Sequence, residues 1–465
     1  MVFTNLQTLK EVKLYNLFEK LTDRSTAAFL ADCLTAETSE EQVAERQAFF
    51  RKLEDEAFYS ECLAQYDHMC LMKKAYDSYV DKDDPLYRSL TFFRMLDQYY
   101  YFTDDAGMKA DIENVRALYE VERNFHCRMF SKYDNQRYSV ELSVTDKELK
   151  NPLKGLFDYL ELKEDSYVES YRIYGSLYEM IKATDPRPFD AMDGIFLKYR
   201  DRVLPGIESV LARLPKLRFF LEMKRFYNAL SARHIPYVMA EFTDEREFSV
   251  HSARDITLIT SNVENIISND FYFTEEKRFW FITGANGGGK TSFLRSVGLC
   301  LILGRLGCYM PARYGRLYRI NKLISFFPME EDLARGRFFA EKERLAAAIA
   351  ETDSDTMLLM NEVFTSTDEE KARTESQAAL EEILERHCFG VFVTHNFPLI
   401  DSMSDRMPVL EALTEGDEHS RLFKIVEKKQ GGSSFAEDVL RKYGLDGTTL
   451  RRKYNDFQTE RGEAV

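Results

Sequence analysis

The chain has 465 residues, a length that usually divides into two or three domains because one hydrophobic core rarely grows that large. Its formal net charge of −15, from 63 basic and 78 acidic side chains, argues against a surface that binds polyanions indiscriminately, although a local basic groove is compatible with it. The 7 cysteines contain no Cys-x-x-Cys pair, which argues against a disulfide framework or a zinc site and indicates a reducing, cytoplasmic setting. The most apolar run, 297–303, is too short to span a bilayer and the amino terminus lacks a signal-peptide pattern, so no membrane role is expected.

Residues 1–240 are predicted to be mainly helical, since Leu, Phe, Tyr, Lys and Glu recur at helical spacing with few glycines. Ser39-x-x-Gln42 has the spacing of a capping box, and the helical pattern then continues towards Tyr79. The sequence therefore predicts one long helix here, ended by the turn-forming residues 81–85. Residues 138–144 alternate like a strand, and the sequence assigns them no function.

From about residue 241 the pattern changes to short β-rich runs separated by helical segments, the order typical of an α/β nucleotide-binding domain. Three apolar runs, 280–283, 357–360 and 391–394, are short enough to be strands buried on both faces of a mixed or parallel sheet. A polar segment follows each run. Because ligands of open α/β sheets bind at the carboxyl ends of the strands, the three segments are expected to converge on one crevice.

A complete phosphate-binding loop, Gly-Ala-Asn-Gly-Gly-Gly-Lys-Thr, occupies 284–291, between the first strand-like run and a helix-like run. Its glycines permit positive φ and bring successive N–H groups against phosphate oxygens, which the positive end of the next helix also attracts. Lys290 is expected to reach the β- and γ-phosphates, and the Thr291 hydroxyl to complete the shell of a Mg²⁺ ion. The predicted cofactors are ATP and Mg²⁺, and the predicted nucleotide-binding residues of the loop are Gly284, Ala285, Asn286, Gly287, Gly288, Gly289, Lys290, Thr291 and Ser292.

The run that ends at Asn361 and Glu362 is interpreted as the second nucleotide motif. A carboxylate at this position can orient water and accept its proton near the γ-phosphate, so Glu362 is the predicted general base; the alternative is an ordinary acidic residue at a strand end. Most such ATPases carry Asp at the preceding position, where this chain has Asn361. The amide oxygen can still accept a hydrogen bond from metal-bound water, but the lost charge predicts weaker metal binding and slower turnover. The predicted metal-site residues are Thr291, Asn361 and Glu362.

His395 ends the third strand-like run. Its imidazole could hydrogen-bond the γ-phosphate and so sense whether ATP or ADP is bound; the alternative is a structural histidine. Lys290, Glu362 and His395 are therefore the predicted catalytic residues.

Four segments in this order, 282–298, 306–312, 358–367 and 391–395, resemble the ATPase domain of the MutS family. Asn286 within the loop and the later Gly-Cys-Tyr-Met-Pro-Ala segment are typical of MutS-type loops and not of phosphate-loop enzymes in general. The resemblance implies an ABC-type ATPase whose dimer sandwiches nucleotide between two domains, with long lever helices that couple nucleotide state to a DNA clamp. It predicts an α/β P-loop NTPase (ABC-type) domain over 241–412, preceded by a mainly α-helical core or lever domain over 1–240 and followed by a small helical segment over 413–465 that closes the ATPase domain.

Three departures from the family pattern limit what the resemblance implies. The core-like helices begin near residue 39, which leaves no room for a mismatch-reading domain, and Phe220-Leu-Glu222, which has the letters of its wedge, lies in a helical pattern and is interpreted as packing. The partner-contacting segment, 331–344, offers Phe338 where the family has a serine; Arg335 or Arg337 could substitute. Ile266 and Ile267 fall where the family often places an aromatic residue against adenine, so aliphatic contact and looser base selectivity are expected.

Two functions from different classes follow. The leading hypothesis is a MutS-like, homodimeric protein that binds ATP, hydrolyses it slowly and couples nucleotide state to DNA binding in repair or recombination. The alternative is a nucleotide-gated switch that binds a protein partner, with little DNA binding or hydrolysis. Asn361, the absent serine and the acidic net charge favour the alternative.

Overall fold

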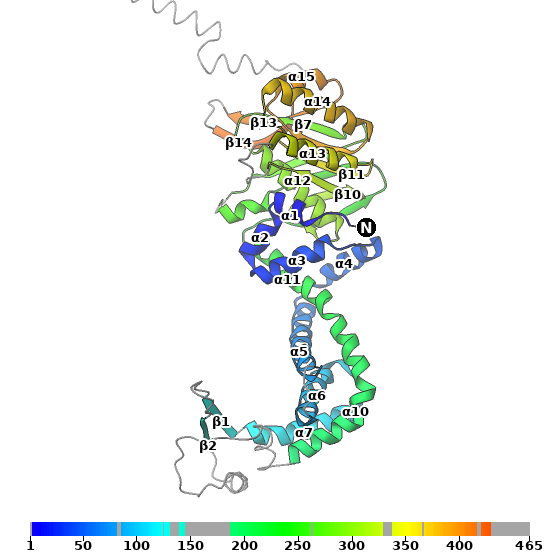
Figure 1. Ribbon diagram of the computed structural model, residues 1–465, viewed down its shortest axis with the longest axis vertical. Helices are drawn as coiled ribbons and strands as arrows, with labels where there is room; N and C mark the ends of the chain where they lie inside the picture. The colour runs from blue at the N-terminus through cyan, green and yellow to red at the C-terminus, as the bar shows by residue number, and fades with distance from the viewer. Residues whose placement is uncertain are drawn as a thin grey trace, which may run out of the picture. The chain divides into compact units, whose positions relative to one another are not determined.

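The computed structural model describes residues 2–80, 85–123, 125–130, 139–144, 187–261, 263, 265–328, 337–364, 367–415 and 420–428. These residues separate into two compact units, one from Met1–Phe50 and Arg225–Val465 and the other from Arg51–Lys224 (Figure 1). Helices and sheets of mixed strand direction are both present, so the predicted α/β class is confirmed. In the described part of the chain, no helix has the length and apolar character needed to cross a membrane.

The first unit contains a six-stranded sheet in which β14 forms one edge and runs antiparallel to its neighbour, while the remaining strands are parallel. The strands, in spatial order, are β10 (Lys322–Phe326), β11 (Thr356–Asn361), β12 (Phe389–Val393), β7 (Phe279–Thr283), β13 (Val409–Glu415) and β14 (Ser420–Glu427). All residues of β7, β11 and β12 are buried, as expected for strands covered on both faces. The three predicted strands are therefore confirmed, and they lie side by side.

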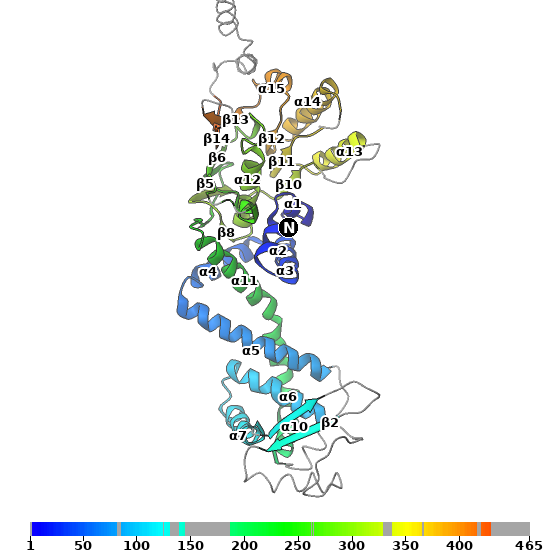
Figure 2. The same cartoon turned by 90° about the vertical axis from the view of Figure 1, so that its left-hand side faces the viewer.

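Helices cover both faces of this sheet. On one face α13 (Arg337–Ala350), α14 (Glu369–Glu385) and α15 (Phe397–Met403) pack against a cluster that includes Phe281, Leu358 and Phe392. On the other face lies α12 (Lys290–Arg305), whose residues are buried from Ser296 to Arg305 (Figure 2). Burial on all sides explains why this helix is apolar over most of its length.

A second, four-stranded sheet packs against α12 in the same unit. Its strands, in spatial order, are β4 (Glu241–Thr243), β9 (Tyr314–Tyr318), β5 (Phe248–Ala253) and β6 (Asn269–Phe273). Nearby, β3 (Val238–Met239) pairs with β8 (Tyr309–Met310), and the 3-10 helix η3 (Ile256–Ser261) connects β5 towards β6. The rings of Phe248 and Phe389 meet edge to face at 4.9 Å and join this sheet to β12.

The amino-terminal helices belong to the unit that contains the sheets, whereas the sequence analysis grouped them with the helical domain. They are α1 (Leu6–Glu11), α2 (Leu14–Leu21), α3 (Arg24–Thr35) and α4 (Glu40–Lys52). Glu11 of α1 accepts hydrogen bonds from Ser325 of β10 and from Arg344 of α13, the latter at 2.6 Å. This buried ion pair fixes α1 against the sheet and one of its covering helices.

The predicted capping box is confirmed: the backbone N–H of Ser39 donates to Gln42 Oε1 at 2.9 Å, and that of Gln42 donates to Ser39 Oγ at 3.2 Å. The single helix predicted to follow is wrong, because α4 ends at Lys52 and α5 (Glu56–Val80) starts after a break. The backbone N–H of Phe58 donates to Asp55 Oδ1 at 2.8 Å, so Asp55 caps a new helix. The aspartate offers the backbone a competing hydrogen bond that periodicity alone does not reveal.

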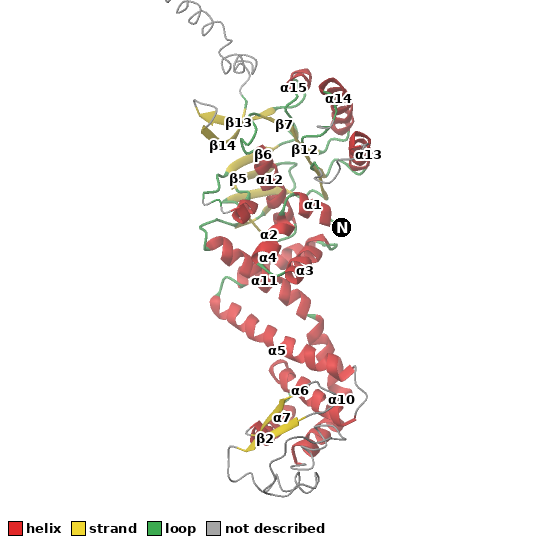
Figure 3. Cartoon of the chain, turned by 60° about the vertical axis from the view of Figure 1, so that its left-hand side comes forward, coloured by secondary structure: helices red, strands yellow, loops and turns green. Residues whose placement is uncertain are grey.

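The second unit is mainly helical and contains α5, α6 (Pro85–Tyr99), the 3-10 helix η1 (Tyr100–Phe102), α7 (Ala106–Arg123) and α10 (Arg187–Ala212), with the first part of α11 (Leu214–Ser231) (Figure 3). The strand expected at 138–144 is present as β2 (Ser139–Val144), antiparallel to β1 (Phe125–Phe130). Phe220 lies within α11 and is 1% exposed, in agreement with the interpretation of Phe220-Leu-Glu222 as packing.

Residues 413–415 and 420–427 are strands, although the sequence analysis predicted helix from 413 onward. β13 pairs in parallel with β7, and β14 folds back antiparallel on β13. The edge of the sheet therefore extends past the predicted domain boundary at 412. Residues 429–465, with the rest of the predicted helical segment, and residues 329–336, with Arg335 in the partner-contacting segment, lie outside the described residues.

Candidate nucleotide-binding site

The loop between β7 and α12 has the backbone of a phosphate cradle. Gly284 and Gly289 have φ values of 123° and 96°, a region that residues with a Cβ atom rarely adopt. A Cβ atom at Gly284 would also lie 3.0 Å from the backbone nitrogen of Ala412 on β13. The loop can therefore close tightly against the sheet and present the amino terminus of α12 to an anion.

Lys290, the first residue of α12, is 4% exposed. Its Nζ donates to the carbonyl oxygens of Gly284 at 2.9 Å and Ala285 at 3.0 Å. Burial lowers the pKa of Lys290, the nearby Glu362 carboxylate raises it, and the Arg421 guanidinium lowers it further. In the described part of the chain no ion pair neutralises this ammonium group, so an anion in the loop would supply a countercharge.

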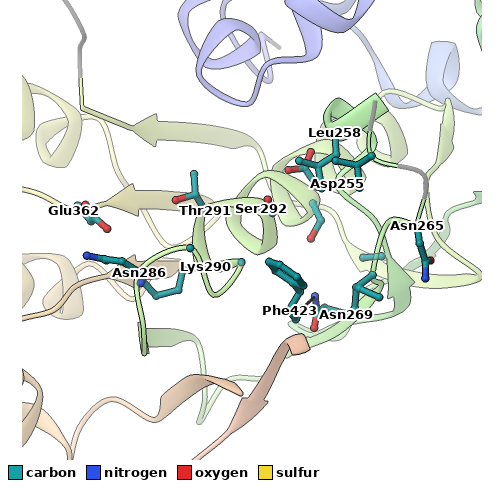
Figure 4. Close-up of a pocket in the computed structure, with 16 residues that line it drawn as sticks. Asp255, Leu258, Asn265, Asn269, Asn286, Lys290, Thr291, Ser292, Glu362 and Phe423 are labelled. Carbon is teal, nitrogen blue, oxygen red and sulfur yellow. Dashed lines mark hydrogen bonds between the residues drawn. The ribbon is translucent and has the colours of Figure 1, made fainter. Parts of the chain in front are cut away.

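Three further predicted residues lie near this loop at the carboxyl ends of neighbouring strands, and Figure 4 shows one of them, Glu362. Thr291 Oγ1 lies 3.3 Å from Oδ1 of Asn361, the last residue of β11. Nε2 of His395, which follows β12, lies 3.4 Å from Oε1 of Glu362. The three polar segments expected to converge are thus close together in space, as the parallel order β11, β12, β7 requires.

Glu362 has a strained backbone, with φ at 50°, and its N–H donates to the carbonyl of Val393 at 3.0 Å. The adjacent His395 imidazole lowers the pKa of Glu362, burial opposes this effect, and the charge of Lys290 lowers the pKa further. The carboxyl is therefore ionised at neutral pH and can accept a proton or a hydrogen bond from water.

A cavity of about 300 Å³ starts at these polar groups and runs along the first turns of α12. Its phosphate end is lined by Asn286, Gly287, Gly289, Lys290, Thr291, Ser292 and Glu362 (Figure 4). Its far end, which we call the base end, is lined by Leu258, Val263, Asn265, Ile267, Asn269 and Phe423, with Asp255 deep inside. A polar end joined to a mainly apolar end suits a phosphorylated ligand that carries a flat ring.

Apart from Ile267, none of the residues that line the base end was predicted from the sequence, and two of these missed residues are Phe423 and Asp255. Phe423 on β14 is 44% exposed, has φ at 53°, and lies against Gly289 of the loop. The side chain of Asn269 holds this strand in place, because its Nδ2 donates to the carbonyl of Phe423 at 3.1 Å and its Oδ1 accepts from the N–H of Ile425 at 2.8 Å. The only sequence signal for Phe423 was an aromatic residue in a β-rich run, and that run was assigned to a helical segment.

Asp255 is the second missed residue and is 3% exposed. Its Oδ1 accepts hydrogen bonds from the N–H and the hydroxyl of Thr257 at 3.1 and 2.5 Å. Burial raises the pKa of Asp255, while Thr257, Arg295 and Ser292 lower it. A single acidic residue in a loop gave no sequence signal that it would be enclosed in a cavity.

Of the remaining predicted residues, some line the cavity and others do not. Ile267 lines the base end, whereas the neighbouring Ile266 is 8% exposed and is not among the residues that line the cavity. Gly284, Ala285 and Gly288 belong to the loop but do not line the cavity. Asn361 does not line it either and contacts the site through its hydrogen bond with Thr291.

Residues 280–451 match the family model described as MutS domain V. A DNA mismatch repair protein MutS from Orientia tsutsugamushi (strain Ikeda) is 29% identical over 227 residues, which are 46% of this chain and 25% of that relative. A protein of the same description from Thermotoga maritima is 26% identical over 265 residues, which are 56% of this chain and 32% of that relative. The matches thus span a quarter to a third of the length of these curated relatives. The predicted resemblance to the MutS family is confirmed for the matched part of the chain.

Proposed function

We propose that this chain is a MutS-related ATPase that binds MgATP in the cavity, hydrolyses it slowly as a homodimer and couples the nucleotide state to DNA binding in repair or recombination. One observation supports the proposal: the Lys290 loop and Glu362, which are far apart in sequence, line one cavity, with Asn361 beside Thr291 and His395 beside Glu362. The cysteine usage agrees with a cytoplasmic location.

In this function the loop amides and Lys290 bind the β- and γ-phosphates and stabilise the negative charge that develops in the transition state. Glu362 orients a water molecule and accepts its proton while the water oxygen attacks the γ-phosphorus and the bond to the bridging oxygen breaks. His395, next to Glu362, hydrogen-bonds the γ-phosphate and senses its presence.

The residues present fit a Mg²⁺ ion, since Thr291 and Asn361 offer oxygen donors 3.3 Å apart beside the loop. Bound with the nucleotide, the ion would neutralise phosphate charge. These two donors are neutral, so even with the Glu362 carboxylate nearby the protein would hold Mg²⁺ more weakly than a site with an aspartate at 361. Slow turnover follows from this weaker site.

DNA binding and dimerisation rest on the family resemblance. The relatives are called DNA mismatch repair proteins, and the matches cover 25% and 32% of their length, not the whole proteins. The acidic net charge of −15 favours a second function, a nucleotide-gated switch that binds a protein partner.

A Glu362→Gln variant tests the hydrolytic cycle. It should bind MgATP as the wild type does, hydrolyse it about 10²–10⁴-fold more slowly, and show dimer mass by light scattering when ATP is present. Glu385→Gln, an exposed residue at the end of α14, is the matched control and should leave all three properties unchanged. If calorimetry detects no binding of MgATP to the wild type, the proposed function is wrong.

A gel-shift assay separates the two functions. The Glu362→Gln protein with ATP is mixed with duplex, branched and single-stranded DNA over a range of salt concentrations. Retardation that weakens with salt supports DNA binding. If no substrate is retarded at low salt while ATP still binds, the protein-binding switch is the better account.

A further inference from the structure

Arg421, on the edge strand β14, lies directly over the phosphate loop. A Cβ atom placed on Gly287 would overlap Nη1 of Arg421 and would lie 3.0 Å from its Cζ. Gly287 has φ at 71° and lines the phosphate end of the cavity. The glycine thus leaves room for a guanidinium group against the loop backbone, where a larger residue would displace it.

The charges around the loop are unbalanced. Arg421 is exposed, and within the described residues it makes no hydrogen bond or ion pair with a carboxylate. It lies close enough to Lys290 to lower the pKa of that ammonium group. Two cations therefore lie beside the loop, and the Glu362 carboxylate is the negative group whose charge acts on Lys290. An anion with several charges would relieve this repulsion.

We propose that Arg421 is a second phosphate-binding cation of the site and that it contacts the polyphosphate of a nucleoside triphosphate bound to the same chain. This inference rests on the proposed function. A guanidinium group suits this task because its planar array of N–H donors can bind two phosphate oxygens at once. The strand that carries Arg421 also carries Phe423, which lies against Gly289 at the base end. One short strand would then contact both the phosphates and the base of the nucleotide.

The test compares ligands that differ in phosphate number. Binding of adenosine, ADP and a slowly hydrolysed ATP analogue, with Mg²⁺ present, is measured by calorimetry for the wild type, Arg421→Gln and Arg421→Lys. Arg421→Gln should weaken the triphosphate about tenfold and ADP by less, and should leave adenosine unchanged, since one charge-assisted contact is lost. Arg421→Lys should recover part of the triphosphate affinity. Lys428→Gln removes the same charge just beyond the end of β14 and should bind all three ligands like the wild type.

Two outcomes would overturn the assignment. Arg421→Gln could bind the triphosphate as tightly as the wild type, or it could weaken all three ligands equally, which would indicate that Arg421 only supports the shape of the site. Equal thermal melting temperatures of the variants and the wild type would show that folding is not the cause of a loss. If the wild type itself binds none of the three ligands, the proposed function fails and the Arg421 assignment fails with it.

Discussion

The two ends of the nucleotide cavity are built in different ways. The phosphate end is formed mainly by residues 284–292, which are contiguous in sequence, and Glu362 is added from a neighbouring strand. The base end is formed by Leu258, Ile267 and Asn269, together with Phe423 from a strand more than a hundred positions later in the chain. One end depends on a backbone shape that a local motif encodes, and the other on side chains that the tertiary fold brings together.

This difference has a functional consequence. Backbone amides and one buried ammonium group can bind any phosphate chain, so in the proposed function the phosphate end would provide affinity without distinguishing between bases. In the proposed function a nucleotide base would lie against Ile267 and Phe423, while the polar atoms of Asn269 are already bonded to β14. In this proposal the contacts of Ile267 and Phe423 with the base would depend on shape and stacking, and Asn269 would add no hydrogen bond to it.

Substitution of Lys290 by alanine should have the largest effect. It removes the buried cation that contacts the loop at Gly284 and Ala285, so affinity for ATP and for inorganic tripolyphosphate should both fall by about a hundredfold or more. Calorimetry with both ligands measures the loss. Lys342→Ala, which breaks an exposed ion pair with Glu375, should change neither affinity. Wild-type affinity for ATP in the Lys290 variant would show that the phosphate end is wrongly assigned.

The same difference explains what could be predicted from sequence. Residues 284–291 carry their chemistry in consecutive letters between a strand and a helix, and Asn361, Glu362 and His395 each end an apolar strand, so parallel order alone brings them together. Phe423 could not be placed, because the strand pairing of β14 with β13 depends on contacts outside its own sequence. The break at 53–55 was missed for a related reason, since the cap at Asp55 overrides an unbroken apolar pattern.

Substitution of Phe423 by alanine tests the base end. Loss of one stacking contact typically weakens binding about tenfold, and here the loss should be the same for ATP and for adenosine. Tripolyphosphate should bind to this variant as it does to the wild type, in contrast to the Lys290 variant. Leu422→Ala, at the neighbouring exposed position, is the control. If tripolyphosphate loses as much affinity as ATP, Phe423 acts by shaping the loop at Gly289 and not by stacking.

Substitution of Asn361 by aspartate tests whether residue 361 contributes to Mg²⁺ binding at the phosphate end. The new carboxylate would face Thr291 Oγ1, now 3.3 Å from the amide oxygen, and would place a negative charge where the proposed metal site has a neutral amide oxygen. The Mg²⁺ concentration that gives half-maximal ATP hydrolysis should fall roughly three- to tenfold, because the added charge should strengthen metal binding by about 1 kcal/mol. A titration of hydrolysis against Mg²⁺ measures this value. An unchanged or higher requirement would mean that residue 361 does not act on the metal.

The smallest expected effect concerns pH and the pair formed by Glu362 and His395. The His395 imidazole, 3.4 Å from the carboxylate, is the largest cause that lowers the pKa of Glu362, so the carboxylate form persists to lower pH and hydrolysis should fail only as the pH falls through that lowered value. His395→Gln removes this contact and leaves burial, which raises the pKa; the acid limb of the kcat profile should therefore move to higher pH. The profile is normalised to its neutral plateau, because Glu362 stays ionised there in both proteins. An acid limb that stays in place or moves to lower pH would show that His395 does not set the ionisation of Glu362. The same limb should be absent in Glu362→Gln, whose residual hydrolysis lacks the titrating base.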